Sequence, residues 1–299
     1  EMVPRRRLLL PGLLAACALA LGGCGGAGGV IQPGTPDGAE APPSIPGMTP
    51  VTVNERLLMP TSVAMGRVGE GANAVLVMRR VDAPPDQPLL IWLHGYGTAS
   101  VSSQEQWLQH MTKRATVVFP IYTQFPYPVG PRFGQIAWPI IARALRRTLP
   151  KLQYDPRKLI VGGYSLGGAL ANDYAVNWRA ERLPKPYGLF SVFSGRALET
   201  GDVYLPRQRG SISPDTDVVQ MASRNDLLAG VREASFVIAK TPRAAPRRLI
   251  LVREYAYGDH FAPTRTGREE RRIFWVPLDE LIDRVNARAE RAQGAGGAA

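Results

Sequence analysis

Residues 159–170, with the sequence LIVGGYSLGGAL, constrain the fold more than any other stretch of this chain. The stretch opens with an apolar, β-branched run that is typical of a buried strand. It continues with the pattern G-x-S-x-G at Gly163, Ser165 and Gly167, and small residues with helical spacing follow. A serine at a sharp strand-to-helix turn has a strained backbone and an exposed hydroxyl, while flanking glycines avoid Cβ clashes. The stretch therefore predicts strand, turn and helix, with Ser165 as a candidate nucleophile. An incidental serine in a glycine-rich turn is the alternative.

Further apolar runs of strand length alternate with helical patterns along the chain. The expected strands cover residues 62–67, 74–79, 89–93, 116–120, 187–193, 217–222 and 248–252. Ser102 and Glu105 have capping-box spacing and should open a helix. Apolar stripes at helical spacing include Trp107, Leu108 and Met111, then Val231, Ala234, Phe236 and Ile238, and finally Leu278, Leu281, Ile282 and Val285. Two strands followed by repeated strand–helix units predict an α/β fold with a mostly parallel central β-sheet and helices on both faces.

The two ends of the chain differ in composition from the rest. Arginines 5–7 precede an apolar run at 8–21, as in a secretory signal, and the following Leu21-Gly22-Gly23-Cys24 resembles a bacterial lipobox. We therefore expect a lipoprotein signal peptide at 1–23 and lipidation of Cys24; ordinary secretion with a free Cys24 thiol is the alternative. Gly- and Pro-rich residues 24–50 are typical of a flexible tether, and 292–299 of a disordered tail. Residues 51–291 then form a single domain.

Composition narrows the classes of partner and cofactor. The formal net charge is +11, but the arginines are scattered and no aromatic-basic motif accompanies them, so we expect no nucleic-acid partner. Attraction to anionic lipid or cell-wall polymer fits this charge better, and general solvation by an arginine-rich composition fits it best. Cys17 leaves with the signal, so the domain has no pair of cysteines for a disulfide. We find no metal-ligand cluster, dinucleotide-binding glycine pattern or P-loop, and expect neither metal nor cofactor.

A serine hydroxyl needs a base, and the chain has three histidines. His110 sits in a helical pattern and should be a surface residue. His94 follows an apolar strand directly and should orient its loop. His260 lies in a loop after the last strand, where it can reach Ser165, and is the candidate general base.

The imidazole needs a carboxylate to hold its tautomer, and after a nucleophile elbow the acid precedes the histidine in chain order. Asp226 fits because it follows the strand at 217–222. A helix cap is the alternative role for Asp226. Asp259 is a less suitable acid because neighbouring side chains of an extended loop point apart, and Asp217 opens the strand at its wrong end. Asp202 and Asp215 lie in an irregular insertion.

Two backbone donors should stabilise a developing oxyanion. One is the N–H of Leu166, the residue after the nucleophile, and the other is the N–H of Tyr96, in the loop after the strand at 89–93. The side chains of Tyr96, Tyr122, Phe125 and Tyr127 are candidates for the lining of a substrate pocket. Trp138 is a further candidate, for which core packing is the alternative.

Together these motifs resemble the α/β-hydrolase superfamily. His94-Gly95-Tyr96-Gly97, Gly163–Gly168, Asn225-Asp226 and His260 follow the family's order and span nearly the whole expected domain. Residues 258–263, GDHFAP, resemble the dienelactone-hydrolase and secreted-esterase branch, which implies no large lid domain. Tyr164 stands where related sequences often carry histidine.

Together with the expected lipidation of Cys24, the resemblance implies a membrane-tethered serine hydrolase that cleaves small or polymeric carboxylic esters through Ser165, Asp226, His260 and an acyl-enzyme. Its expected location is the bacterial cell envelope, lipid-anchored through Cys24 on the extracytoplasmic side. A thioesterase, peptidase or acyltransferase can use the same triad. The sequence is also compatible with a non-catalytic envelope-binding lipoprotein, and with a basic protein that binds an anionic polymer.

Overall fold

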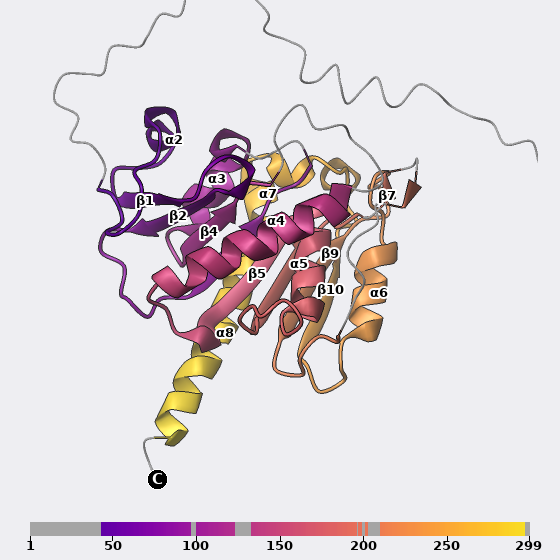
Figure 1. The fold of residues 1–299 in the computed structure, drawn as a ribbon. Coiled ribbons are helices and arrows are strands. Elements are labelled where there is room, and N and C mark those ends of the chain that lie inside the picture. The colour runs from indigo at the N-terminus through magenta and orange to yellow at the C-terminus, as the bar shows by residue number, and fades with distance from the viewer. Residues whose placement is uncertain are drawn as a thin grey trace, which may run out of the picture. The chain divides into compact units, whose positions relative to one another are not determined.

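The computed structural model describes residues 43–96, 100–122, 133–195, 197–198, 201–202 and 210–296. Phe125, Tyr127 and Cys24 lie outside these ranges. Eight strands of the described chain form one sheet in the order β1-β2-β4-β3-β5-β6-β9-β10 (Figure 1). In chain order their bounds are β1 Val63–Val68, β2 Val75–Arg80, β3 Leu89–Leu93, β4 Thr116–Pro120, β5 Leu159–Tyr164, β6 Gly188–Val192, β9 Asp217–Ala222 and β10 Arg247–Leu251.

The sheet is mostly parallel, as the sequence predicts. The pairs β1–β2 and β2–β4 are antiparallel, and every pair from β4 across to β10 is parallel. A second, two-stranded sheet consists of β7 (Ala197–Leu198) and β8 (Gly201–Asp202). In the parallel region the carboxyl ends of the strands meet along one edge, so loops that are distant in sequence become neighbours there.

Helices cover both faces of the sheet. On one face lie α4 (Phe133–Thr148), α5 (Leu166–Asn177) and α6 (Arg232–Lys240); on the other lie α3 (Val101–Met111) and α8 (Val276–Gly296). Figure 1 shows α4, α5 and α6 in front of the strands and α8 behind them. The remaining described helices are short: α2 Val53–Leu57, α7 Arg268–Glu270, and single turns η1 Gly71–Asn73, η2 Leu149–Lys151, η3 Pro156–Lys158, η4 Tyr255–Tyr257, η5 Ala262–Thr264 and η6 Arg271–Trp275.

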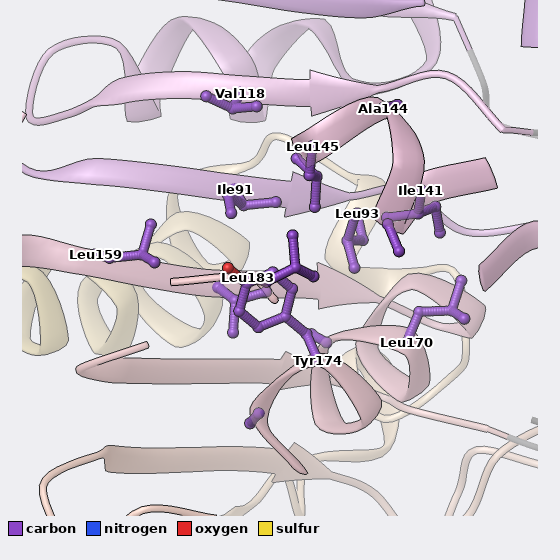
Figure 2. Packing of buried hydrophobic residues seen from close by; sticks show 14 of the residues in the cluster. Ile91, Leu93, Val118, Ile141, Ala144, Leu145, Leu159, Leu170, Tyr174 and Leu183 are labelled. Atoms are coloured by element: carbon purple, nitrogen blue, oxygen red, sulfur yellow. The ribbon is translucent and has the colours of Figure 1, made fainter. Parts of the chain in front are cut away.

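Strand β3 shows why the central strands are continuously apolar. Its five residues are fully buried, and successive side chains point to opposite faces. Ile91 and Leu93 pack under α4 and α5, whereas Leu90 and Trp92 pack against α3 and α8. Figure 2 shows the first of these layers, where side chains of β3, β4 and β5 meet Leu145, Leu170 and Tyr174 from the helices that cover this face. A strand covered on both faces cannot alternate with polar residues.

Helix α3 starts from a different cap than the sequence predicts. Ser100 is the N-cap, and its side chain accepts a hydrogen bond from the Ser103 N–H at 3.3 Å. The expected box between Ser102 and Glu105 does not form, because the helix begins before Ser102. In α6 the predicted apolar stripe is also partly wrong. Phe236 is exposed, and Ala234 and Val237 are the buried residues.

Both ends of the described domain extend beyond the predicted limits of 51 and 291. Ser44 and Thr49 form β-bridges with Met65 and Arg67 on the outer edge of β1, and Ile45 is buried. At the other end α8 continues to Gly296. These two segments contain few large apolar residues. The sequence pattern therefore predicts neither the pairing of residues 44–49 with β1 nor the continuation of α8 to Gly296.

Length and apolar character together decide whether a helix can cross a lipid bilayer. None of the described helices is both long enough and apolar enough to cross a membrane.

Candidate active site

Ser165 occupies the turn between β5 and α5 in a strained conformation. Its φ of 57° and ψ of −124° place it in a region that L-residues rarely adopt. The turn is tight, because a Cβ added to Gly167 would lie 1.9 Å from the carbonyl oxygen of Leu93, and one added to Gly163 would lie 2.4 Å from the carbonyl carbon of Gly167. The predicted elbow is thus present, and glycine is required where its two arms meet β3.

Three side chains from separate loops form one chain of hydrogen bonds. The Ser165 Oγ lies 2.8 Å from the Nε2 of His260, and the Nδ1 of His260 lies 2.8 Å from the Oδ2 of Asp226. The Asp226 side chain is fully buried and the His260 side chain is one-tenth exposed. The buried carboxylate accepts a hydrogen bond from the Nδ1–H group, which leaves Nε2 as the acceptor that faces the serine hydroxyl. The structure therefore brings together the three residues that the sequence singled out.

The second carboxylate oxygen of Asp226 is held by its own loop. Oδ1 accepts hydrogen bonds from the N–H groups of Leu228 and Ala229, both at 2.9 Å. Helix α6 begins later, with Val231 as its N-cap, so the alternative role of Asp226 as the cap of that helix does not apply. Both oxygens are engaged, and the carboxylate is fixed in orientation toward His260.

The other acidic candidates point elsewhere. Asp259 forms an ion pair with Arg265 at 2.7 Å, although it is adjacent to His260 in sequence. Asp217 pairs with Arg284 on α8, and Asp215 pairs with Lys185. Asp202 belongs to β8, and its side chain is not among those that the structure describes.

The other two histidines do not reach Ser165. His94 is fully buried, donates from Nδ1 to the carbonyl oxygen of Gly95 at 2.7 Å, and stacks on Tyr122 with 3.9 Å between ring centroids. Burial lowers the pKa of His94 to about 4, so the ring is neutral at pH 7. His110 was expected on the surface, but it lies half-buried beside Trp275 and bonds Asp279 of α8 at 3.0 Å. The sequence pattern of α3 alone predicted that His110 is exposed, but the packing of α8 against α3 covers it.

The expected oxyanion donors lie at the same edge of the sheet. Leu166 is the first residue of α5, so its N–H has no carbonyl partner within the helix. A Cβ added to Gly95 would lie 3.3 Å from the Cβ of Ser165, which puts the loop after β3 against the nucleophile. Tyr96 follows in that loop, half-buried against the core. Both residues therefore belong to segments that lie next to Ser165.

The predicted pocket lining is only partly described. Tyr122 does not line a pocket, because it is buried beneath His94 and donates its hydroxyl proton to the carbonyl oxygen of His94. Trp138 packs in the core against Tyr174, so its role is structural and not a place in the pocket. Phe125 and Tyr127 lie outside the described residues.

Among the described residues, no three histidine, cysteine or acidic side chains gather closely enough to hold a metal ion.

A sequence profile of the alpha/beta hydrolase fold matches residues 90–255, more than half of the chain. The chain belongs to the α/β-hydrolase family. The matched residues include the β3 loop, the Ser165 elbow and Asp226. Membership confirms the resemblance predicted from the motifs. It agrees with the mostly parallel eight-stranded sheet, to which the described residues add only a two-stranded sheet. A search among curated proteins found no match.

Solved structures of hydrolases share the fold at low sequence identity. An esterase from Rhizomucor miehei is 16% identical with a TM-score of 0.56, over 75% of this chain and 85% of its own. Esterase B from Lactobacillus rhamnosis is 12% identical with a TM-score of 0.59, over 81% and 93%. A protein from Klebsiella pneumoniae, described as a candidate dienelactone hydrolase, is 13% identical with a TM-score of 0.55, over 74% and 98%. These identities show a common fold, and family membership supports the assignment as a serine hydrolase.

Two contacts around the hydrolase site could not be found from sequence. The Trp107 indole N–H of α3 donates to the carbonyl oxygen of Pro263 at 2.6 Å, three residues after His260. The Tyr164 hydroxyl donates to the carbonyl oxygen of His260 at 2.6 Å. Both aromatic residues carry a polar group that needs a buried partner, but sequence does not say which backbone carbonyl supplies it.

Proposed function

We propose that this α/β-hydrolase cleaves carboxylic esters, with Ser165 as nucleophile, His260 as general base and Asp226 as the residue that orients His260. The observation that carries the proposal is the continuous hydrogen-bonded path from Asp226 through His260 to Ser165 at the elbow. A path of this kind activates a hydroxyl that is otherwise a weak nucleophile. Folding alone does not require a serine, a histidine and an aspartate at these three positions.

The proposed reaction has two halves. Ser165 Oγ attacks the ester carbonyl carbon while its proton moves to the His260 Nε2. The bond to the alcohol oxygen then breaks, and the alcohol leaves with that proton. Water next gives a proton to Nε2 and attacks the acyl-enzyme; the acid departs as Oγ regains the proton. Asp226 orients the ring and stabilises the imidazolium that forms in each half.

The negative charge that develops on the carbonyl oxygen needs fixed donors. We assign this role to the backbone N–H groups of Leu166 and Tyr96. The start of α5 adds the positive end of a helix dipole beside Ser165. Loss of one such donor is expected to reduce turnover by about 10²–10³.

The test is hydrolysis of p-nitrophenyl esters from acetate to decanoate by the full chain and by its Ser165→Ala variant. The proposal expects turnover by the parent chain and a loss on the order of 10⁴ or more in the variant. A folded parent chain with no activity above the variant on any ester overturns the ester proposal. Thioesters, peptides and acyl acceptors are then the next substrates to compare.

We also propose that the protein is anchored in the bacterial cell envelope, on the extracytoplasmic side, by a lipid on Cys24. The support is the sequence of the first 24 residues, which lie outside the described structure. The test is labelling with a radioactive fatty acid and membrane fractionation of cells that produce the parent chain or the Cys24→Ser variant. Label and membrane association should both be lost in the variant. A Cys24→Ser chain that stays membrane-bound and labelled overturns the anchor.

A further inference from the structure

We infer that Tyr164 is a positioning residue that holds the His260 backbone over the nucleophile. This inference rests on the proposed function, because a position for His260 matters only if His260 acts as the base. Tyr164 directly precedes Ser165, and its hydroxyl donates to the carbonyl oxygen of His260 at 2.6 Å. One side chain thus connects the elbow to the loop that carries the base, 96 residues further along the chain.

The ring of Tyr164 contacts the parts of the site that must stay in register. Its centroid lies 5.3 Å from that of the His260 imidazole, in a tilted arrangement. A Cβ added to Gly95 would lie 3.2 Å from the Tyr164 Cδ1, so the ring also packs against the loop after β3. Tyr164 therefore touches the base and the loop expected to hold an oxyanion donor, and is covalently joined to Ser165.

The Phe261 ring also packs edge-on against the His260 imidazole, with 5.7 Å between the ring centroids, and other contacts of the histidine loop restrain its neighbours. Trp107 holds the carbonyl of Pro263, and Asp259 and Arg265 form an exposed ion pair beside the base. The side chain of His260 is held by Asp226, but its backbone carbonyl is held by Tyr164. Removal of the hydroxyl would leave that buried carbonyl without its described partner and allow the imidazole to move relative to Ser165.

The hydroxyl is suited to a permanent role as donor. Tyr164 is almost fully buried, and burial, with the nearby charges of Asp226 and Asp259, raises the pKa of its phenol well above the usual value. The group stays protonated at every pH at which an ester hydrolase can be assayed. It donates to the backbone and does not exchange protons with the substrate.

The test compares the full chain with its Tyr164→Phe variant, using p-nitrophenyl butyrate and a fluorophosphonate that labels activated serines. We expect kcat and the labelling rate to fall about tenfold while KM changes by less than about twofold, because the lost contact aligns the base without touching the ester. Tyr174→Phe is the matched control. Tyr174 is a fully buried tyrosine whose hydroxyl donates to the Pro184 carbonyl at 3.0 Å, away from the triad.

The outcomes separate the inference from the proposed function. If Tyr164→Phe keeps the parent kcat and labelling rate, the positioning role is wrong while the triad stands. If Tyr174→Phe loses as much kcat as Tyr164→Phe, the effect is one of general stability and the inference is also wrong. If the parent chain hydrolyses no ester and is not labelled, the proposed function fails first, and the positioning role fails with it.

Discussion

Asp226 and His260 meet across the carboxyl edge of the sheet, with 2.8 Å between Oδ2 and Nδ1, although 34 residues separate them in the chain. Asp226 follows β9 and His260 follows β10, and these two strands are parallel neighbours. Parallel pairing brings the loops after both strands to the same edge. The second carboxylate oxygen is occupied by the backbone of its own loop, so the pair has one orientation rather than several.

Asp226→Asn should lower kcat by on the order of 10³–10⁴, with a folded protein. The N–H groups of Leu228 and Ala229 would retain the amide oxygen, so the amide NH2 group would face Nδ1 and favour the tautomer with the proton on Nε2. Asp259→Asn is the matched control. Asp259 is the acidic neighbour of His260 in sequence, but it pairs with Arg265 on the surface and should keep near-parental activity. Steady-state ester hydrolysis measures both. The assignment of the acid is wrong if Asp259→Asn is the more damaging substitution.

Gly167→Ala should prevent the elbow from forming, because the added Cβ would lie 1.9 Å from the Leu93 carbonyl oxygen. We expect a loss of at least about 3 kcal/mol in the free energy of unfolding, at the upper end of overpacking costs. Gly294→Ala provides the control, since a Cβ there meets nothing within 4 Å. Urea unfolding followed by circular dichroism measures both variants. Parental stability in Gly167→Ala would contradict the described contact between α5 and β3.

His94 should make the fold less stable as the pH falls. Burial lowers its folded pKa from 6.5 to about 4, so between these values the unfolded chain binds a proton that the folded chain does not. The stability is fully present above pH 6.5 and declines toward pH 4, by about 3 kcal/mol in total.

The measurement for His94 is the free energy of unfolding at several pH values in the parent and in His94→Asn. Asparagine can place an amide nitrogen where the Nδ1 of His94 donates to Gly95, but it does not titrate. The parent should lose more stability than the variant between about pH 7.5 and 4.5. Parallel curves would mean that His94 titrates normally in the folded protein.

A chain shortened to start at Val51 should be less stable than one that starts at Ala41. The shorter chain lacks Ile45, which is buried, and the two backbone hydrogen bonds between Thr49 and Arg67. Burial of one large aliphatic side chain and those bonds together contribute about 3 kcal/mol. Urea midpoints of the two chains measure the difference. Equal midpoints would show that residues 43–49 add nothing to the sheet.

Much of the fold and of the candidate site could be predicted because its signals are local. The strands were predictable because a strand buried on both faces must be apolar throughout, as Leu89–Leu93 is. The nucleophile was predictable because the turn requires glycine at 163 and 167. His94 was separated from His260 by its position directly after a strand. The amphipathic stripe of α8 is confirmed, because Leu278, Leu281, Ile282 and Val285 are all buried.

The errors occurred where a residue's surroundings come from elsewhere in the chain. Tyr122 has the sequence context of a pocket aromatic in a proline-rich loop, but the buried ring of His94 stacks on it. His110 has the pattern of a surface residue until α8 supplies Asp279. Phe236 fits a helical stripe, but the sheet leaves its side of α6 uncovered.

By itself the sequence determined the class of fold, the strained serine turn and the residue types able to activate that serine, since each depends on neighbours within a few positions. The tertiary structure alone decided which backbone groups hold the second oxygen of Asp226 and which carbonyl the Tyr164 hydroxyl reaches. The physical reason is that a hydrogen bond between two loops forms only when the donor–acceptor distance is correct to within a few tenths of an ångström. The packing of the parallel strands fixes that distance. Local patterns specify which groups are present, and the sheet specifies which of them meet.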